Sequence, residues 1–399
     1  MTRVCNNERK YVLEVLDSEF RTSLGSVMTT RLEENFAKKF GTNFAISHIN
    51  GTATLHSALY AAGVGPGEEI IVPPLTMSST SFAVLQQNAI PVFADIDKKT
   101  FEISPESIEK CITKKTKAIM TVALYGLSPD MDKIMKIAKE HDLVVIEDDA
   151  QCFLAKYKGK LVGTIGDISS FSFQSSKHMT SGEGGMILTN NEKYANAIRR
   201  FSSLGYKGVS SKKGKITKKD IQDPQYERHV CLGYNYRMSE LCAAVALGQL
   251  EHLDELVGCR VYAAKKFDAV LKEKNCEWLI PQFVPDDCTN SYWTYVVKLQ
   301  TDDFSWYEFR DKFMEFGGDG IYAAWQLTYL EPVFRNKFFN GLEKLFSNSF
   351  WQKYERGLCP IAELTQPKLL QFKTNYWDKS DADEQASILS KTIDYFDKK

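Results

Sequence analysis

The feature that most constrains the fold is an alternation of short apolar strands and helices over the first half of the chain. The predicted strands are 45–49, 69–72, 90–94, 118–124, 143–146, 168–173 and 186–189, and the predicted helices between the first five of them are 52–62, 79–87, 104–111 and 130–141. Near-continuous apolar strands separated by helices indicate a mostly parallel sheet that is covered on both faces. In such sheets ligands bind at the carboxyl ends of the strands.

The pattern changes in the last third of the chain, which indicates a second unit. Helices are predicted at 239–256, 260–271, 306–316 and 383–396, and an aromatic strand at 292–299. We therefore predict a large domain over 26–254, which carries the sheet, and a smaller C-terminal α/β domain over 255–399. We expect the N-terminal segment, 1–25, to pack on the small domain.

Composition excludes several classes of protein. The 399 residues carry a net charge of −1, so no general attraction to nucleic acid is expected. No apolar run is long enough to span a bilayer, and the polar residues after Met1 do not resemble a signal peptide. The nine cysteines are scattered without paired or metal-finger spacing, which is typical of reduced thiols. We therefore expect a cytoplasmic protein without membrane insertion, nucleic-acid partner or bound metal.

A lysine follows the predicted strand 168–173 in a turn rich in serine and glycine. A side chain in that position is held by rigid structure and reaches into a cleft, where burial lowers the pKa of its ammonium group. The neutral amine can then attack a carbonyl carbon. Lys177 is therefore a candidate nucleophile, although an isolated surface lysine would look the same in sequence.

Two further segments supply groups that fit one cofactor. Asn50-Gly51-Thr52 joins a predicted strand to a helix, and backbone N–H groups at such a helix start bind phosphate. The Thr52 and Ser172 hydroxyls are candidates for the same phosphate. A simple helix cap and an ordinary strand serine are the alternatives for these residues.

The second segment, Glu147-Asp148-Asp149-Ala150-Gln151, ends the strand 143–146. Buried carboxylates need a cation, and a protonated pyridine nitrogen is the partner that we expect for Asp148, because it keeps the ring able to accept electrons. Gln151 could bond a ring substituent. A metal site built from Asp95, Asp97, Asp148 and Asp149 is the alternative, but it leaves Lys177 and the phosphate site without a role.

With these segments together, the chain resembles sugar aminotransferases of the DegT/StrS family, within the fold-type-I enzymes that use pyridoxal 5′-phosphate. The likeness runs from Phe36 to at least Asn375. It is carried by Asn50-Gly51-Thr52-Ala53, Gly67-Glu68-Glu69-Ile70-Ile71-Val72-Pro73, Glu147-Asp148-Asp149-Ala150-Gln151, Ser172-Phe173-Gln174-Ser175-Ser176-Lys177, Gly182-Glu183-Gly184-Gly185 and Gly233-Tyr234-Asn235-Tyr236-Arg237-Met238. The order and spacing of these motifs are specific to the family. The resemblance implies a three-layer large domain with a mostly parallel sheet and a smaller C-terminal domain.

The resemblance also implies roles for single residues. Lys177 matches the lysine that forms the Schiff base with the cofactor and shuttles the proton, and Asp148 matches the partner of the ring nitrogen. Gln151 matches a residue near the ring hydroxyl, and the phosphate ligands match Gly51, Thr52 and Ser172. Asn235 matches an asparagine that reaches the phosphate from the neighbouring subunit, which implies a homodimer with shared active sites.

Other positions bear on the substrate. Arg237 lies in the same motif as Asn235 and is a candidate for binding a donor or substrate anion. Met77 stands where the family usually has an aromatic residue stacked on the cofactor, and a thioether can pack on the same ring. The segment that contains Tyr322 and Trp325 and the loop 206–230 are expected to shape the substrate pocket.

The expected function is transfer of an amino group from glutamate to a ketosugar, expected to be a nucleotide-linked keto-deoxysugar, in surface polysaccharide or aminosugar biosynthesis. A dehydratase on the same scaffold and a regulatory homologue without turnover are the alternatives. Some dehydrating relatives carry histidine at the lysine position, and here Lys177 and His178 are adjacent. Counting five residues on from Ser172, or five back from Gly182, gives Lys177, so we expect transamination.

Overall fold

The computed structural model describes residues 2–25, 27–212, 214, 216–339, 341 and 354–398. The α-helices are α1 (Asn6–Asp17), α2 (Met28–Phe40), α3 (Gly51–Ala61), α4 (Ser79–Gln86), α5 (Pro105–Cys111), α6 (Met131–Glu140), α7 (Glu192–Phe201), α8 (Lys218–Gln222), α9 (Glu240–Glu251), α10 (Leu253–Glu273), α11 (Trp306–Glu315), α12 (Pro332–Arg335), α14 (Pro360–Thr365) and α15 (Lys379–Phe396). Short 3₁₀ turns lie at Thr22–Leu24, Leu124–Gly126, Thr328–Leu330 and Gln366–Lys368.

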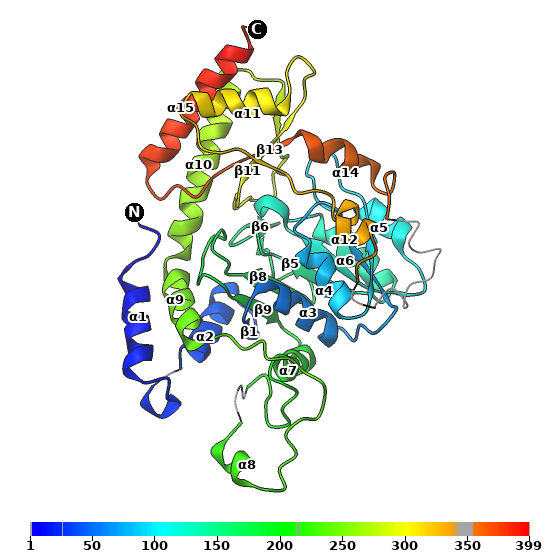
Figure 1. Ribbon diagram of the computed structural model, residues 1–399, viewed down its shortest axis with the longest axis vertical. Coiled ribbons are helices and arrows are strands. Elements are labelled where there is room, and N and C mark those ends of the chain that lie inside the picture. Colours follow the sequence, from blue (N-terminus) through cyan, green and yellow to red (C-terminus); the bar gives the residue numbers. More distant parts are fainter. Residues whose placement is uncertain are drawn as a thin grey trace.

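A seven-stranded sheet forms the centre of the large domain (Figure 1). Its order is β1 (Phe44–His48), β9 (Gly185–Thr189), β8 (Ile168–Ser172), β5 (Val144–Asp148), β4 (Thr116–Val122), β2 (Glu69–Val72) and β3 (Ile90–Phe93). β9 runs antiparallel to β1 and β8, and the other neighbours pair in parallel. The prediction of a mostly parallel sheet is confirmed.

Side chains along each strand alternate between two cores, as the pleat of a strand requires. In β2, Ile70 and Val72 join a core formed with α3, α4 and α7, whereas Ile71 joins a core formed with α5 and α6. The sheet is therefore covered on both faces, and this explains why its strands are apolar at almost every position.

The small domain has its own antiparallel sheet and its own core. The sheet order is β10 (Leu279–Pro281), β11 (Tyr295–Leu299), β13 (Leu369–Phe372) and β12 (Tyr322–Ala323). Apolar residues of α10, α11 and α15 pack on this sheet. The long helix α10 begins beside the large domain and continues into the small one (Figure 1). It starts at Leu253, and the domain boundary that we placed near residue 254 stays a prediction.

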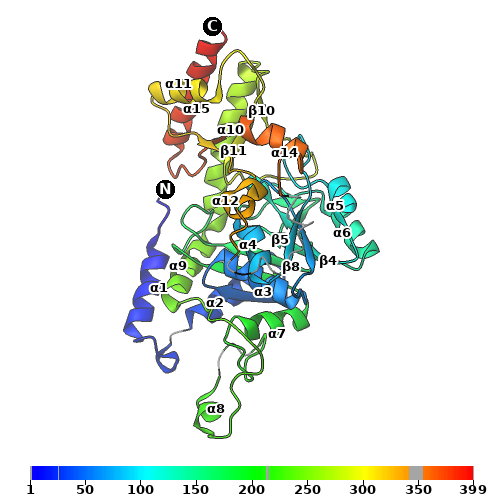
Figure 2. The same cartoon turned by 45° about the vertical axis from the view of Figure 1, so that its right-hand side comes forward.

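Helix α1 of the N-terminal segment lies against α9. In both views α1 runs beside α9 (Figures 1 and 2). Tyr11 and Val15 of α1 belong to the core that α9 and α2 form with the β8–β9 end of the sheet. Arg3 contacts the predicted small domain, because its guanidinium lies 5.3 Å from the centre of the Trp377 ring. The expected packing of residues 1–25 on that domain stays a prediction.

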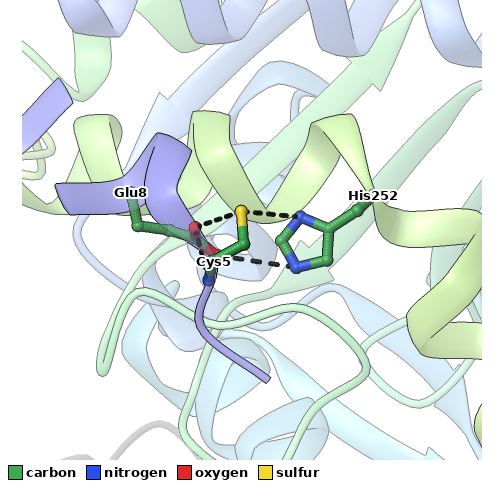
Figure 3. Close-up of side chains that lie close together, drawn as sticks. All are labelled: Cys5, Glu8 and His252. Atoms are coloured by element: carbon green, nitrogen blue, oxygen red, sulfur yellow. Dashed lines mark hydrogen bonds and ion pairs between the residues drawn. The ribbon is translucent and has the colours of Figure 1, made fainter. Parts of the chain in front are cut away.

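A polar cluster fastens the start of α1 to the end of α9 (Figure 3). The Glu8 carboxylate accepts hydrogen bonds from the Cys5 N–H (2.9 Å) and thiol (2.8 Å), and from the Gln249 amide (2.6 Å). His252 Nδ1 lies 2.8 Å from the Gly248 carbonyl oxygen and 3.7 Å from the Cys5 sulfur. These donors and acceptors are satisfied by one another, so the cluster acts as an anchor for the helix.

Among the described helices, none combines the length and the apolar character needed to cross a bilayer.

Two small features complete the fold. A hairpin of β6 (Lys156–Tyr157) and β7 (Lys160–Leu161) lies between β5 and β8 in the sequence. The predicted loop 206–230 carries α8, which projects away from the sheet at the end opposite the small domain (Figure 2).

Candidate active site

A cavity of about 510 Å³ lies where the carboxyl ends of β4, β5 and β8 meet the start of α3. Among the predicted site residues, those that line it are Gly51, Thr52, Met77, Asp148, Gln151, Ser172, Lys177 and Trp325. The fold thus gathers eight residues that are spread over 275 positions of the sequence (from 51 to 325) into one cavity.

One end of the cavity is suited to an anion. Asn50 caps α3, because its side-chain oxygen accepts the Ala53 N–H at 2.8 Å. The N–H groups of Gly51 and Thr52 in the first turn then have no intrahelical acceptor. Ser172 lies against this turn, so close that a Cβ at position 51 would be 2.9 Å from the Ser172 Cβ. The Ser172 oxygen accepts the Gln174 N–H at 3.3 Å, which leaves its hydroxyl hydrogen to donate.

A buried carboxylate faces the same cavity from the end of β5. Asp148 accepts hydrogen bonds from the Thr80 hydroxyl (2.8 Å) and the Ala150 N–H (3.2 Å). Burial raises the pKa of Asp148, whereas these two bonds and the Lys177 ammonium act in the opposite direction. The side chain is only 5 % exposed, so a protonated ring nitrogen in the cavity would be a stabilising partner for it.

The carboxylates on either side of Asp148 do not line the cavity. Glu147 accepts three backbone N–H groups, from Gly163 (3.1 Å), Ile165 (2.9 Å) and Gly166 (2.6 Å). Burial and the neighbouring carboxylates raise the pKa of Asp149 well above its usual range, which favours the protonated acid. Of the three successive acids, Asp148 is therefore the one that lines the cavity, and its role there stays a prediction.

The metal site that we considered for four aspartates does not form. Asp95 accepts the N–H groups of Ile361 (2.8 Å) and Ala362 (2.9 Å) at the start of α14. Asp97 closes its own turn by accepting the Lys99 N–H at 2.8 Å. Within the described ranges, the group of three potential ligands that lie within 4.8 Å of one another is the anchor cluster of Figure 3, far from these aspartates in sequence.

Lys177 reaches the cavity from the turn that follows β8. Its Nζ lies 4.6 Å from the centre of the Trp293 ring. Burial lowers the pKa of Lys177 to about 8, with Arg260 acting in the same direction and with Asp148 and Glu183 opposing it. A substantial fraction of the amine is therefore neutral near physiological pH, as a nucleophile or a proton acceptor requires.

His178 points elsewhere. Its ring is fully buried, and its Nε2 donates a hydrogen bond to the Ser291 carbonyl oxygen at 2.9 Å. It does not line the cavity. Of these two neighbours, Lys177 therefore lines the cavity and His178 does not, and the reactive role of Lys177 stays a prediction.

Gln151 is oriented by the backbone. Its side-chain oxygen accepts the Tyr125 N–H at 2.9 Å, which fixes the orientation of the amide. Tyr125 has a positive φ of 61°, a conformation that is uncommon for a residue other than glycine. The amide NH₂ group of Gln151 remains as a donor at the cavity wall.

Three predicted site residues lie outside the cavity of this chain. Asn235 and Arg237 are exposed, on the segment that leads into α9. Tyr322 on β12 is 53 % exposed. Their roles stay predictions, and the role that the resemblance implies for Asn235 is in the site of a second subunit.

Sequence analysis missed two neighbours of the reactive groups. Trp293, from the segment before β11, lies under the Lys177 amine and stacks at 5.7 Å on Trp325. Thr80, in the first turn of α4, holds Asp148. Trp293 is over a hundred residues from Lys177, and no local pattern signals this contact.

Comparison with known proteins gives the family. Residues 3–360 match the DegT/DnrJ/EryC1/StrS aminotransferase family. The chain belongs to this family. It is therefore a sugar aminotransferase of the kind that depends on pyridoxal 5′-phosphate, as the resemblance implied.

Members of this family are similar to the chain over most of its length. The GDP-perosamine synthase of Escherichia coli O157:H7 is 39 % identical over 295 residues, which are 74 % of this chain and 75 % of the relative. An L-glutamine:2-deoxy-scyllo-inosose aminotransferase of Streptomyces lividus is 35 % identical over 67 % of this chain and 62 % of its own. The crystal structure of an aminotransferase from Psychrobacter cryohalolentis superposes with a TM-score of 0.84 at 29 % identity, covering 97 % of this chain and 96 % of the other.

The residues present fit the family's cofactor. The absence of a Cβ at Gly51 lets Ser172 lie against the first turn of α3, and Ser172 has a hydroxyl hydrogen to donate there. A buried acid, Asp148, and a lysine of lowered pKa, Lys177, face the same space. This set matches the general arrangement of a lysine Schiff base with an acidic partner for the pyridine nitrogen.

Proposed function

We propose that this aminotransferase moves the amino group of glutamate onto the keto group of a nucleotide-linked keto-deoxysugar. The observation that supports transfer chemistry best is the placement of Lys177 and Asp148 at one cavity that also carries an anion site. The relatives named as GDP-perosamine synthases support a nucleotide-linked sugar as the acceptor. A cytoplasmic location is part of the same proposal.

Each of the cavity residues has its own role in this proposed reaction. Pyridoxal 5′-phosphate, when bound, supplies a carbonyl carbon that exchanges amines and a ring that accepts electrons. Gly51, Thr52 and Ser172 bind its phosphate, and Asp148 keeps a proton on the ring nitrogen. Lys177 Nζ would hold the cofactor covalently at its carbonyl carbon. As a free amine, it would accept the proton from the substrate carbon that bears nitrogen and donate it to that cofactor carbon.

The aromatic wall of the cavity suits a sugar substrate. Trp293 and Trp325 stack at 5.7 Å with an angle of 28° between their planes, and both line the cavity. Broad apolar faces of this kind bury much area at low entropic cost. We propose that Trp325 contacts the acceptor, with Met77, 49 % exposed at the rim, beside the cofactor ring.

A substrate panel tests the proposed function. Purified holoenzyme would be given ¹⁵N-labelled glutamate or glutamine with several nucleotide-linked ketosugars and with a keto-inositol, and the products would be read by mass spectrometry. We expect ¹⁵N transfer from glutamate to a nucleotide-linked ketosugar. Transfer only to the keto-inositol would overturn the proposed acceptor, and transfer from glutamine alone would overturn the proposed donor.

The dehydratase alternative predicts a different product and a different reactive residue. We expect Lys177→Ala to stay folded but lose the visible absorbance that borohydride bleaches, together with amino transfer. His178→Ala should retain substantial amino transfer, because its ring contacts Ser291 and not the cavity. A deoxygenated sugar released without nitrogen transfer would decide for dehydration, and absence of any turnover by the parent enzyme would favour a regulatory homologue.

We also propose a homodimer with shared active sites. Asn235 and Arg237 are exposed in the single chain, and Val230, Leu232 and Tyr234 on the same segment expose apolar side chains. A partner subunit would cover this segment and receive Asn235 at its phosphate site. Mixed dimers of Lys177→Ala and Asn235→Ala chains should regain one intact site and part of the activity that each variant alone lacks; a fully active monomer in sedimentation would contradict the proposal.

A further inference from the structure

Three successive backbone carbonyls in the turn of the reactive lysine receive hydrogen bonds from two arginine side chains. Arg3 donates to the Ser175 oxygen (2.6 Å) and to the Lys177 oxygen (2.6 Å). Arg260 donates to the Ser176 oxygen (2.9 Å) and to the Lys177 oxygen (3.2 Å). The Lys177 carbonyl is therefore held from two sides, by residues 174 positions before it and 83 after it.

Arg260 is built into the interior of the protein. Only 1 % of it is exposed, and it reaches the turn from α10. Its other amino group donates to the Trp293 oxygen (2.7 Å) and the Thr374 hydroxyl (3.1 Å). No carboxylate among the described residues pairs with it, and burial lowers the pKa of Arg260. A buried charge without a counter-ion is costly, so its hydrogen bonds to carbonyls must offset that cost.

Arg3 is held in place by its own backbone. The Arg3 carbonyl oxygen accepts the Gln249 amide at 2.6 Å and lies 3.3 Å from His252 Nε2. His252 belongs to the cluster that fastens α1 to α9 (Figure 3). The guanidinium groups of Arg3 and Arg260 lie 5.3 Å and 5.8 Å from the centre of the Trp377 ring, which stabilises both cations.

We propose that Arg3 and Arg260 are positioning residues, which hold the backbone of the Lys177 turn so that the lysine amine faces the cavity. Arginine suits this role because its planar group offers several donors in a fixed arrangement. Trp293 adds a third donor, from its ring N–H to the Ser176 oxygen at 2.9 Å. The N-terminal segment thereby becomes part of the active site, although it contributes no residue to the cavity lining.

Arg260 also brings positive charge close to the Lys177 amine. Arg260 adds to the effect of burial in lowering the pKa of Lys177, whereas the carboxylates of Asp148 and Glu183 raise it. The neutral amine is therefore available at a lower pH with Arg260 in place. The catalytic consequence of this arrangement rests on the proposed function, but the arrangement itself can be measured without turnover.

The test measures the reactivity of Lys177 in protein from which the cofactor has been removed. Acetic anhydride acylates only the neutral amine, so the rate of Lys177 labelling against pH, read by peptide mass spectrometry, gives a midpoint and a limiting rate. The midpoint of this curve reports the pKa of the amine. The limiting rate at high pH reports how accessible the neutral amine is to the reagent. The variants are Arg3→Ala, Arg260→Gln and Arg260→Lys, with Arg9→Ala, an exposed arginine of α1, as the matched control.

We expect a parental midpoint near pH 8, from the lowered pKa of Lys177. Arg260→Gln should raise it by about one unit, because a neighbouring positive charge is lost, and Arg260→Lys should restore it. Arg3→Ala should change the limiting rate several-fold and weaken binding of pyridoxal 5′-phosphate, and Arg9→Ala should change neither.

The inference is overturned if folded Arg3→Ala keeps the parental limiting rate and cofactor affinity. Arg3 precedes α1 and is only half-buried, so this variant decides the matter even if the Arg260 variants fail to fold. Failure of amino transfer by the parent enzyme, with the labelling pattern as expected, would instead count against the proposed function alone.

Discussion

Replacing Gly51 by alanine tests the proposed phosphate site at the point where the start of α3 lies against Ser172. The added Cβ would lie 2.9 Å from the Ser172 Cβ and 3.2 Å from its hydroxyl oxygen. Carbon atoms in contact prefer about 3.5–4.0 Å. The start of α3 and the end of β8 must therefore move apart by roughly 0.6–1 Å, which is the difference between these distances.

This displacement separates two groups that should hold one phosphate. If the phosphate loses one charge-assisted hydrogen bond, the cost is about 1.5–3 kcal/mol. A loss of that size weakens cofactor binding roughly 10- to 100-fold, since each 1.4 kcal/mol is a factor of ten. The variant should remain folded, because strain from one extra methyl group commonly costs about 1–3 kcal/mol.

The assay is titration of protein freed of cofactor, followed by absorbance. Gly258→Ala is the matched control, because a Cβ at that position in α10 would meet nothing within 4 Å. Pyridoxal, which lacks the phosphate, should bind the parent and Gly51→Ala alike. The reasoning is refuted if Gly51→Ala binds pyridoxal 5′-phosphate as tightly as the parent, or if it loses pyridoxal binding to the same extent.

Two further predictions concern buried charges. Asp148→Asn should keep the fold but lower the rate of the half-reaction with glutamate by about 100-fold or more, which is the range for one preorganised charged group. The control is Asp149→Asn, whose side chain does not line the cavity and which should stay near the parental rate. Equal rates for the two variants would reject the assignment of Asp148. Arg199→Ala should cost about 3–5 kcal/mol in urea unfolding, because it leaves the Glu33 carboxylate buried without its partner at 2.6 Å. A loss below about 1 kcal/mol would show that the pair behaves as an exposed one.

Local sequence patterns predicted much of the site. The period of the apolar residues identified the strands, and strand ends are where ligands bind in such sheets. Asp148, Ser172 and Lys177 each follow or end a strand of that kind, and all three line the cavity. Alternation along β5 also explains why Asp148 faces the cavity while Glu147 and Asp149 do not.

The small domain was harder to predict. Its strands β10 and β12 have only three and two residues, too few to show a period, and β13 is buried at each position without alternation. The helices predicted at 239–256 and 260–271 are α9 and α10, which meet at His252 with hardly an interruption. Apolar residues on both sides of that point obscured the short break.

Sequence alone determined the large-domain sheet, and it predicted that the turn at Gly51 and the residue Lys177 would share one site, which the cavity lining agrees with. Only the tertiary structure placed Arg3, Arg260 and Trp293 around the turn of that lysine, and only it placed α1 on α9. The reason is physical: periodicity, caps and turn residues act within about one or two helical turns. The contacts around the lysine turn join positions 83 to 174 residues apart, and Tyr11 of α1 bonds Glu251 of α9 across 240 residues. Such contacts depend on the packing of helices and strands that are distant in the sequence, and on the entropy lost when the chain between them is closed into a loop. A short stretch of sequence does not encode either of these factors.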